Sequence, residues 1–231
     1  MSTQQAGTEG TRGMAQRGDT ESDLAELRGP RARRLPADKY EARRVELAEA
    51  ALETLGELGY AKTSLREIAQ KSDFTHAVLH YYFTDKLDLI RCSIRHFKAR
   101  CITRYDVVTA EAQTCEQLME GFLEKLAETI RDEQQMHCLW YDLRSQALFE
   151  ESFRDVVNEI DESLEDMVWR IVKRYAELGG KQPTVTSSVA YALLDGLFQK
   201  HLLRHVSKDP NAIQRLLDEV RDLLPKLTGN R

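Results

Sequence analysis

The sequence contains little proline, glycine or cysteine, and it has no long apolar run. Its 231 residues include 5 Pro, 12 Gly and 4 Cys. The cysteines show no C-x-x-C spacing, which argues against a zinc ribbon or a redox pair. No segment approaches the ~20 apolar residues that span a bilayer, and no apolar secretory signal opens the chain. These absences exclude a membrane-spanning protein, favour an all-helical fold, and indicate reduced thiols in a cytoplasmic protein.

Charge is distributed unevenly along the chain. The formal net charge is −5, yet residues 28–44 hold seven Lys/Arg against two acidic residues, whereas residues 105–231 hold 15 basic and 23 acidic side chains. Residues 1–37 have almost no large apolar side chains, so we predict a disordered, arginine-containing extension. Its arginines are compatible with an arm in a DNA minor groove and with a plain solvated tail.

From Asp38 onward the apolar residues repeat with a period of about 3.6, which predicts helices throughout. The expected domains are three short helices over residues 38–84 and a larger helical domain over 85–231. Capping residues Thr63-Ser64, Thr75 and Asp85 mark helix starts, and Gly59 and Gly179-Gly180 mark helix ends. The sequence therefore predicts an all-α fold of about nine helices, near 38–58, 63–72, 75–82, 85–101, 116–131, 137–149, 152–178, 183–206 and 210–227.

The segment Thr63–Lys86 carries the most specific pattern. It reads T-S-L-R-E-I-A, then a turn at Ser72-Asp73, and then a short helix ending in Y-Y-F-T-D-K-L-D-L. Two short helices packed across a tight turn form a helix-turn-helix. Over about 50 residues, from Asp38 to Leu89, this segment resembles the TetR family of one-component bacterial regulators.

The resemblance implies that the third helix enters the DNA major groove, where base edges carry sequence information. It departs from the family at Asp73, where glycine is usual, and at His80, where tyrosine is usual. We expect Asp73 to accept the left-handed backbone of the turn at some cost. The implied base-reading residues are Thr75, His76, Ala77 and Val78. The predicted DNA-backbone contacts are Arg43, Arg44, Thr63, Ser64, His80, Tyr81, Tyr82 and Lys86.

Aromatic, thioether and sparse polar residues in the second domain suggest a small-molecule cavity. The same stripes are also typical of an ordinary helical core. Arg144 could meet an acidic group on a ligand or pair within the protein. The candidate ligand-binding residues are Phe97, Phe122, Met136, His137, Trp140, Tyr141, Arg144, Met167 and Trp169.

The last two long helices are apolar on more than one side, which predicts a two-fold, four-helix dimer interface. The candidate interface residues are Ala192, Gly196, Leu197, Leu203, Leu216, Leu217 and Val220.

These features predict a ligand-responsive DNA-binding regulator, most simply a repressor released by a small-molecule effector. Its partners would be a palindromic double-stranded operator, the effector and a second copy of the chain, with no membrane. Alternatives are a helical-bundle metal-dependent enzyme and a protein-interaction module. No nucleophile–base motif appears, and the His76/His80 and His201/His205 pairs have no third ligand. We therefore expect no catalytic residue, cofactor or metal.

Overall fold

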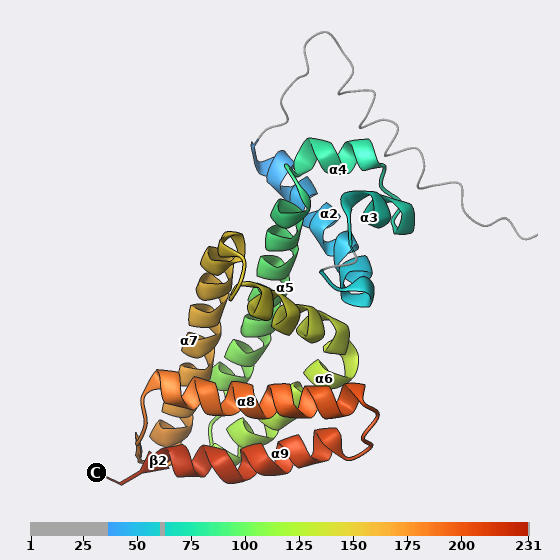
Figure 1. Ribbon diagram of the computed structural model, residues 1–231. Helices are drawn as coiled ribbons and strands as arrows, with labels where there is room; N and C mark the ends of the chain where they lie inside the picture. The colour runs from blue at the N-terminus through green and yellow to red at the C-terminus, as the bar shows by residue number, and fades with distance from the viewer. Residues whose placement is uncertain (1–36, 61–62, 231) are drawn as a thin grey trace, which may run out of the picture.

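The computed structural model describes residues 37–60 and 63–230, and it confirms an all-α fold (Figure 1). Within these ranges there are eight α-helices, two short 3₁₀ helices and one pair of two-residue strands. The predicted disordered extension falls outside the described residues except for Ala37, where helix α2 begins. No described helix is long and apolar enough to cross a membrane.

One helix of 22 residues and two of seven residues form a head at one end of the molecule, so only two of the three helices predicted to be short are short. The three helices are α2 (Ala37–Leu58), α3 (Leu65–Lys71) and α4 (His76–Tyr82). As predicted, α3 and α4 begin at hydroxyl caps: Ser64 Oγ accepts from the Glu67 amide at 3.2 Å, and Thr75 Oγ1 accepts from the Val78 amide at 3.3 Å. The completely buried side chains of the head pack the three helices together. They include Leu47, Leu55, Ile68, Leu79 and Phe83.

The turn between α3 and α4 is closed by a serine. Among the described non-glycine residues only Lys208 has a positive φ, so the expectation of a left-handed Asp73 is wrong. Instead Ser72 is extended, its amide donates to Ile68 O at 2.9 Å, and its hydroxyl accepts from the Phe74 amide at 3.4 Å. The serine hydroxyl supports the chain reversal that a glycine would otherwise make by its backbone freedom.

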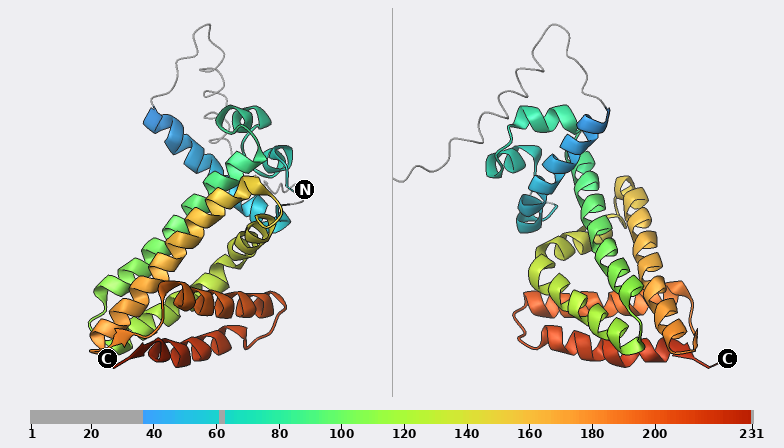
Figure 2. Two further views of the ribbon diagram at one scale, coloured as in Figure 1. Left: turned by 60° about the vertical axis from the view of Figure 1, so that its left-hand side comes forward. Right: turned by 180° about the vertical axis from the view of Figure 1, so that it is seen from behind.

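Helix α5 (Lys86–Glu111) connects the head to the second domain (Figure 1). It begins at the predicted cap Asp85, whose carboxylate accepts from the Asp88 amide at 2.8 Å. Only residues 83–85 separate it from α4. Figure 2 shows α5 running beside α7 (Arg154–Leu178) for most of its length.

Two of the predicted helices are one bent helix. Helix α6 (Cys115–Gln146) covers both predicted segments, 116–131 and 137–149, and bends at Glu133, whose φ of −126° and ψ of 21° are not helical. The run of polar residues from Arg131 to Gln135 interrupts the apolar period, and this produced the prediction of a break. A local kink gives the same change of direction without a loop.

The C-terminal helices form an outer layer. After α7, Gly179 and Gly180 terminate the helix as predicted, with Gly180 at φ +63°. The prediction that Pro183 opens the next helix is wrong, because Gln182–Pro183 (β1) pairs antiparallel with Thr228–Gly229 (β2). Helix α8 (Ser187–Val206) starts at the cap Thr186. Helix α9 (Ala212–Leu223) starts after Asn211, and the 3₁₀ segments are Glu151–Phe153 (η1) and Leu224–Leu227 (η2).

Arg144 on α6 joins three helices of the second domain. Its Nη1 donates to Asp195 Oδ2 on α8 at 2.6 Å, and its Nε donates to Asp161 Oδ2 on α7 at 3.1 Å. The three side chains are only 30%, 16% and 25% exposed. Partly buried charges that lose a partner keep their desolvation cost, so removal of one member of this triad would destabilise the packing of α6, α7 and α8.

Arg144→Leu should lower the free energy of unfolding by about 1–3 kcal/mol, because two half-buried carboxylates lose their cation. Urea unfolding at fixed protein concentration measures the change. The control is Arg95→Leu, which breaks the exposed Arg95–Glu159 pair between α5 and α7 and should cost about 0–1 kcal/mol. Equal losses in the two variants would contradict the stabilising role of the triad.

Candidate DNA-binding surface and ligand cavity

The outer face of α4 and its N-cap residue present two histidines, an alanine and a threonine. Thr75, His76, Ala77 and His80 are exposed. The His76 and His80 rings pack edge to face with centroids 4.4 Å apart, and their Nε2 atoms lie 3.2 Å apart. Val78, predicted beside them, is 1% exposed and belongs to the core. Three of the four predicted base readers are therefore placed where a groove could reach them.

The predicted backbone contacts divide into exposed and buried groups. Ser64 and Tyr81 are exposed, whereas Thr63 and Tyr82 are buried. The Thr63 hydroxyl donates to Gly59 O at 2.7 Å, which is a bond within the head. Thr63 and Tyr82 thus support the exposed residues of this surface from inside the head.

Tyr40, which the sequence reading did not single out, supports the end of α4. Its ring lies against Tyr81 and Tyr82, with centroids 6.1 Å and 4.9 Å away, and its hydroxyl donates to Tyr82 O at 3.3 Å. A tyrosine five residues before Val45 falls off the apolar stripe of α2, so periodicity alone did not reveal this contact.

The predicted basic contacts are held by protein groups. Arg44 donates to Asp88 at 2.6 Å and lies over the Phe83 ring, and Arg43 pairs with Glu46 at 2.7 Å. Lys86 Nζ donates to Tyr60 O at 3.0 Å and lies 4.0 Å from the Tyr60 ring centroid.

Tyr60 also connects the head to the second domain. Its amide donates to Asp142 Oδ2 on α6 at 3.1 Å, and its ring packs edge to face on Phe153.

A second contact between the domains is made at Gly56 of α2. A Cβ added to Gly56 would lie 2.1 Å from Met136 Cε and 3.2 Å from Gln135 Cβ. Glycine therefore allows α2 to lie directly on the bend of α6. Met136, predicted to bind ligand, packs here at the domain junction.

A cavity of about 80 Å³ lies inside the second domain between α5, α6, α7 and α8. This volume holds several water molecules. Five of the nine predicted ligand-binding residues line it: Phe122, His137, Trp140, Tyr141 and Met167. Cys101, which we expected to border the cavity from α5, also lines it. The lining residues that the sequence reading missed are Lys98, Tyr105, Leu126, Thr129, Leu164, Val168, Tyr191, Leu194, Asp195 and Phe198.

The other predicted ligand-binding residues lie near the cavity without lining it. Phe97 is buried and packs edge to face on His137, with centroids 5.5 Å apart. Arg144 pairs within the protein, one of the two roles left open for it. Trp169 is half-buried against the core, as expected for a residue off the main stripe of α7.

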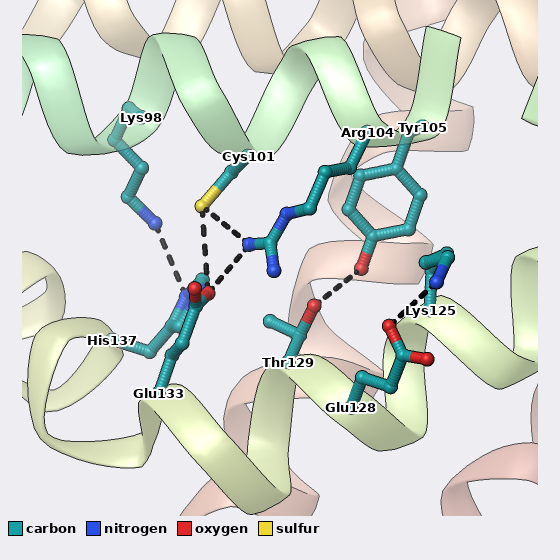
Figure 3. Close-up of polar contacts among 9 residues, drawn as sticks. All are labelled: Lys98, Cys101, Arg104, Tyr105, Lys125, Glu128, Thr129, Glu133 and His137. Atoms are coloured by element: carbon teal, nitrogen blue, oxygen red, sulfur yellow. Dashed lines mark hydrogen bonds and ion pairs between the residues drawn. The ribbon is translucent and has the colours of Figure 1, made fainter. Parts of the chain in front are cut away.

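Lys98 places a buried amine in the cavity wall. Lys98 is 3% exposed, and its Nζ lies 3.2 Å from His137 Nδ1 (Figure 3). The same Nζ lies 5.1 Å from the Trp140 ring centroid. Burial lowers the pKa of Lys98 to about 8. Burial, together with the charges of Lys98 and Arg104, lowers the pKa of His137 well below its ordinary range, so the imidazole is neutral at pH 7.

A second polar group lies beside this pair, where α5 faces the bend of α6 (Figure 3). Arg104 donates to Glu133 Oε2 at 2.6 Å and to Cys101 Sγ at 3.3 Å. The ligand atoms of Cys101, Glu133 and His137 lie within 4.8 Å of one another, as do those of Glu41, Cys92 and His96. The Arg104 guanidinium neutralises Glu133 and opposes a metal cation at the first cluster.

Asp195, which lines the cavity, and the nearby Asp161 accept a hydrogen bond at each carboxylate oxygen. Asp195 accepts from the Tyr141 hydroxyl at 2.8 Å and from Arg144 at 2.6 Å, and Asp161 accepts from the Tyr191 hydroxyl at 2.5 Å. Burial, and next the Asp195 carboxylate, raises the pKa of Tyr141, which therefore remains a donor.

The predicted dimer residues lie on opposite sides of α8 and α9. Leu216 and Val220 are completely buried within the chain, so their side chains face inward. Ala192, Gly196 and Leu203 are exposed, while Leu197 and Leu217 are half-buried. The outward face of α8 also exposes Val189, Leu193 and Val206, which the predicted set did not include.

Comparisons with known proteins agree with this architecture. Residues 47–91 match the family model described as bacterial regulatory proteins of the tetR family, and residues 111–225 match the BetI-type transcriptional repressor C-terminal model. The HTH-type transcriptional regulator BetI of Paraburkholderia xenovorans is 36% identical over 56 residues, and that of Burkholderia thailandensis is 34% identical over 56 residues. Each match covers 24% of this chain and 29% of the relative.

Solved structures share the fold at low sequence identity. A TetR transcription regulator from Haloarcula marismortui is 20% identical with a TM-score of 0.67, covering 81% of this chain and 100% of that one. A putative transcriptional regulator from Saccharomonospora viridis, solved with choline, is 14% identical with a TM-score of 0.67 over 82% and 99% of the two chains. FadR from Bacillus subtilis, solved with stearoyl-CoA, is 18% identical with a TM-score of 0.64 over 78% and 96%.

The head contains a helix-turn-helix, and the helical domain attached to it contains a cavity. This architecture places the protein in the class of helix-turn-helix regulators. The chain belongs to the TetR family of bacterial transcriptional regulators.

Lys98→Met should raise the free energy of unfolding by about 1–3 kcal/mol at pH 7, because it removes a charge that burial disfavours. The folded-state pKa of about 8 lies below the unfolded value of 10.5, so the penalty is full below pH 8 and fades toward pH 10.5. The difference between variant and wild type, from urea unfolding at pH 7–10, should shrink accordingly. The exposed Lys173 provides the control Lys173→Met, which should show no such trend. A pH-independent difference for Lys98→Met would be evidence against a charged, buried amine.

Proposed function

We propose that the protein is a transcriptional repressor whose affinity for DNA is lowered by a small molecule bound in the cavity. The observation that carries the proposal is the path of α5. Its first turn follows the exposed face of α4 after three residues, and three turns later Lys98, Cys101 and Tyr105 form one wall of the cavity. A displacement of α5 by an occupant would therefore reorient the head.

The proposed DNA surface is the N-terminal half of α4. Thr75, His76 and Ala77 would meet base edges, with Val78 supporting them from the core. Ser64, His80 and Tyr81 would contact phosphates, as these residue types commonly do. Arg43, Arg44 and Lys86 are further proposed phosphate contacts. For Lys86 this requires the ammonium to leave the Tyr60 carbonyl.

The proposed assembly is a homodimer through the outward faces of α8 and α9. Two copies of the head would then meet two half-sites of a palindrome about one helical turn apart. The boundaries we propose are residues 38–84 for the DNA-binding domain and 85–231 for the ligand-binding and dimerisation domain. The proposed role involves no catalysis, and we place the protein in the cytoplasm.

His76→Ala should change the base preference at one or two operator positions, because base edges carry the sequence information. The test measures binding of the ligand-free protein, at fixed salt, to DNA from upstream of its own coding region, with each base pair substituted in turn. His205→Ala on α8 is the matched control and should leave the preference unchanged. Failure of the wild-type protein to prefer this DNA over competitor DNA would refute the proposed function. An unaltered preference in His76→Ala would remove His76 from the readers.

Gly196→Arg should convert the dimer to a folded monomer. Gly196 is exposed and an added Cβ would meet no atom of its own chain within 4 Å, so the substitution costs little inside the subunit. Sedimentation velocity at micromolar concentration gives the mass, and circular dichroism gives the helix content. Ala99→Arg, at an exposed position on α5, should remain dimeric. A dimeric Gly196→Arg would show that the interface lies elsewhere.

A further inference from the structure

The cavity wall holds more buried hydrogen-bond donors than acceptors available to them. Lys98 Nζ has three N–H groups when charged, and its one protein partner among the described residues is His137 Nδ1. Because that nitrogen accepts from Lys98, the neutral imidazole carries its proton on Nε2. His137 Nε2 is buried and has no hydrogen-bond partner within the described part of the chain. The same holds for Trp140 Nε1.

The acceptor groups around the cavity already have other donors. Both Asp195 oxygens accept hydrogen bonds, one from Tyr141 and one from Arg144. The hydroxyls of Tyr105 and Thr129 bond to each other at 3.0 Å. Glu133 Oε2 accepts from Arg104 and lies 4.0 Å from His137 Nε2, which is too far for a hydrogen bond.

Buried donors without acceptors are costly and are uncommon in native structures. Here the two unpartnered donors, His137 Nε2 and Trp140 Nε1, belong to residues that line the same cavity as Lys98, whose ammonium has His137 Nδ1 as its one partner among the described residues. An occupant with acceptor oxygens and negative charge would satisfy them together. Another part of the lining, which includes Phe122, Leu164, Met167 and Phe198, is apolar and suits a hydrocarbon body.

We propose that the effector is a small organic oxyanion, such as a monocarboxylate, whose charged end binds Lys98 with His137 and Trp140 and whose apolar end fills the cavity. This inference rests on the proposed function and names the ligand class for the same site. It excludes quaternary ammonium ligands such as the choline bound by the Saccharomonospora viridis protein. A cationic ligand would meet the Lys98 ammonium, and the nearby carboxylates Asp161 and Asp195 are already paired with Arg144.

The test is isothermal titration of the purified full-length protein with straight-chain monocarboxylates of two to ten carbons, benzoate and phenylacetate. Each is compared with its uncharged amide, and choline is the cationic probe. At least one carboxylate should bind 10-fold or more tightly than its amide and than choline. Binding by no carboxylate, or equal binding by an amide or by choline, would overturn the proposal.

Substitutions identify the group responsible. Lys98→Met keeps most of the side-chain volume and should weaken the best carboxylate at least 10-fold while leaving its amide unchanged. Trp140→Phe keeps an aromatic ring, removes the indole N–H, and should weaken the carboxylate three- to tenfold. Lys173→Met is the control and should bind like wild type. Unchanged carboxylate affinity in Lys98→Met would overturn the assignment. Melting temperatures without ligand show that each variant is folded.

The same preparation separates this inference from the proposed function. DNA binding by the ligand-free protein tests the function, and carboxylate binding tests the ligand class. DNA binding without any carboxylate binding would refute the inference alone. Lys98-dependent carboxylate binding by a protein that does not recognise its upstream DNA would refute the proposed repressor. If both hold, linkage requires the bound carboxylate to weaken DNA binding by the same factor by which DNA weakens the carboxylate.

Discussion

The packing of α5 is the constraint on which the rest of the structure depends. Its N-terminal turns bury Leu89 and Ile90 in the core of the head, and its middle turns bury Phe97 and Cys101 in the second domain. The Ser93 hydroxyl of α5 also donates to Ala48 O of α2 at 2.8 Å. A single rigid element therefore belongs to two cores, and neither core can shift against α5 without losing close packing.

Local signals in the sequence were sufficient for the helices but not for every boundary. Ser64, Thr75 and Asp85 cap helices because their side chains accept from amides three residues ahead, which is a purely local interaction. Pro183 was misread because its partner, Thr228, lies 45 residues away in the chain. The polar run before Gln135 suggested a loop, whereas packing of Gly56 against Met136 accommodates a bent continuous helix.

Only the aromatic and thioether residues of the cavity could be predicted from the sequence. Trp140, Phe122 and Met167 have the composition of a binding pocket, so a reading by residue type finds them. Lys98 lies between Phe97 and Ala99 on a helix, and the usual expectation for a lysine is exposure. Its burial depends on His137, 39 residues further on, which no period in the sequence reveals. The inward position Val78 was assigned to the DNA surface by the family resemblance, whereas Leu216 and Val220 were assigned to the dimer surface because their helix carries apolar residues on more than one side.

The β1–β2 pair also constrains the C-terminal hairpin. It joins the residues just before α8 to those just after α9, and the Thr184 amide adds a bond to Leu227 O at 2.8 Å. Helices α8 and α9 are thereby held together at both ends, by their connecting turn at one end and by the strand pair at the other (Figure 2). Tyr191 and Leu194 of α8 line the cavity. A shift of α8 at the cavity would therefore move α9 as well, so the outward faces of the two helices would move together as a rigid unit.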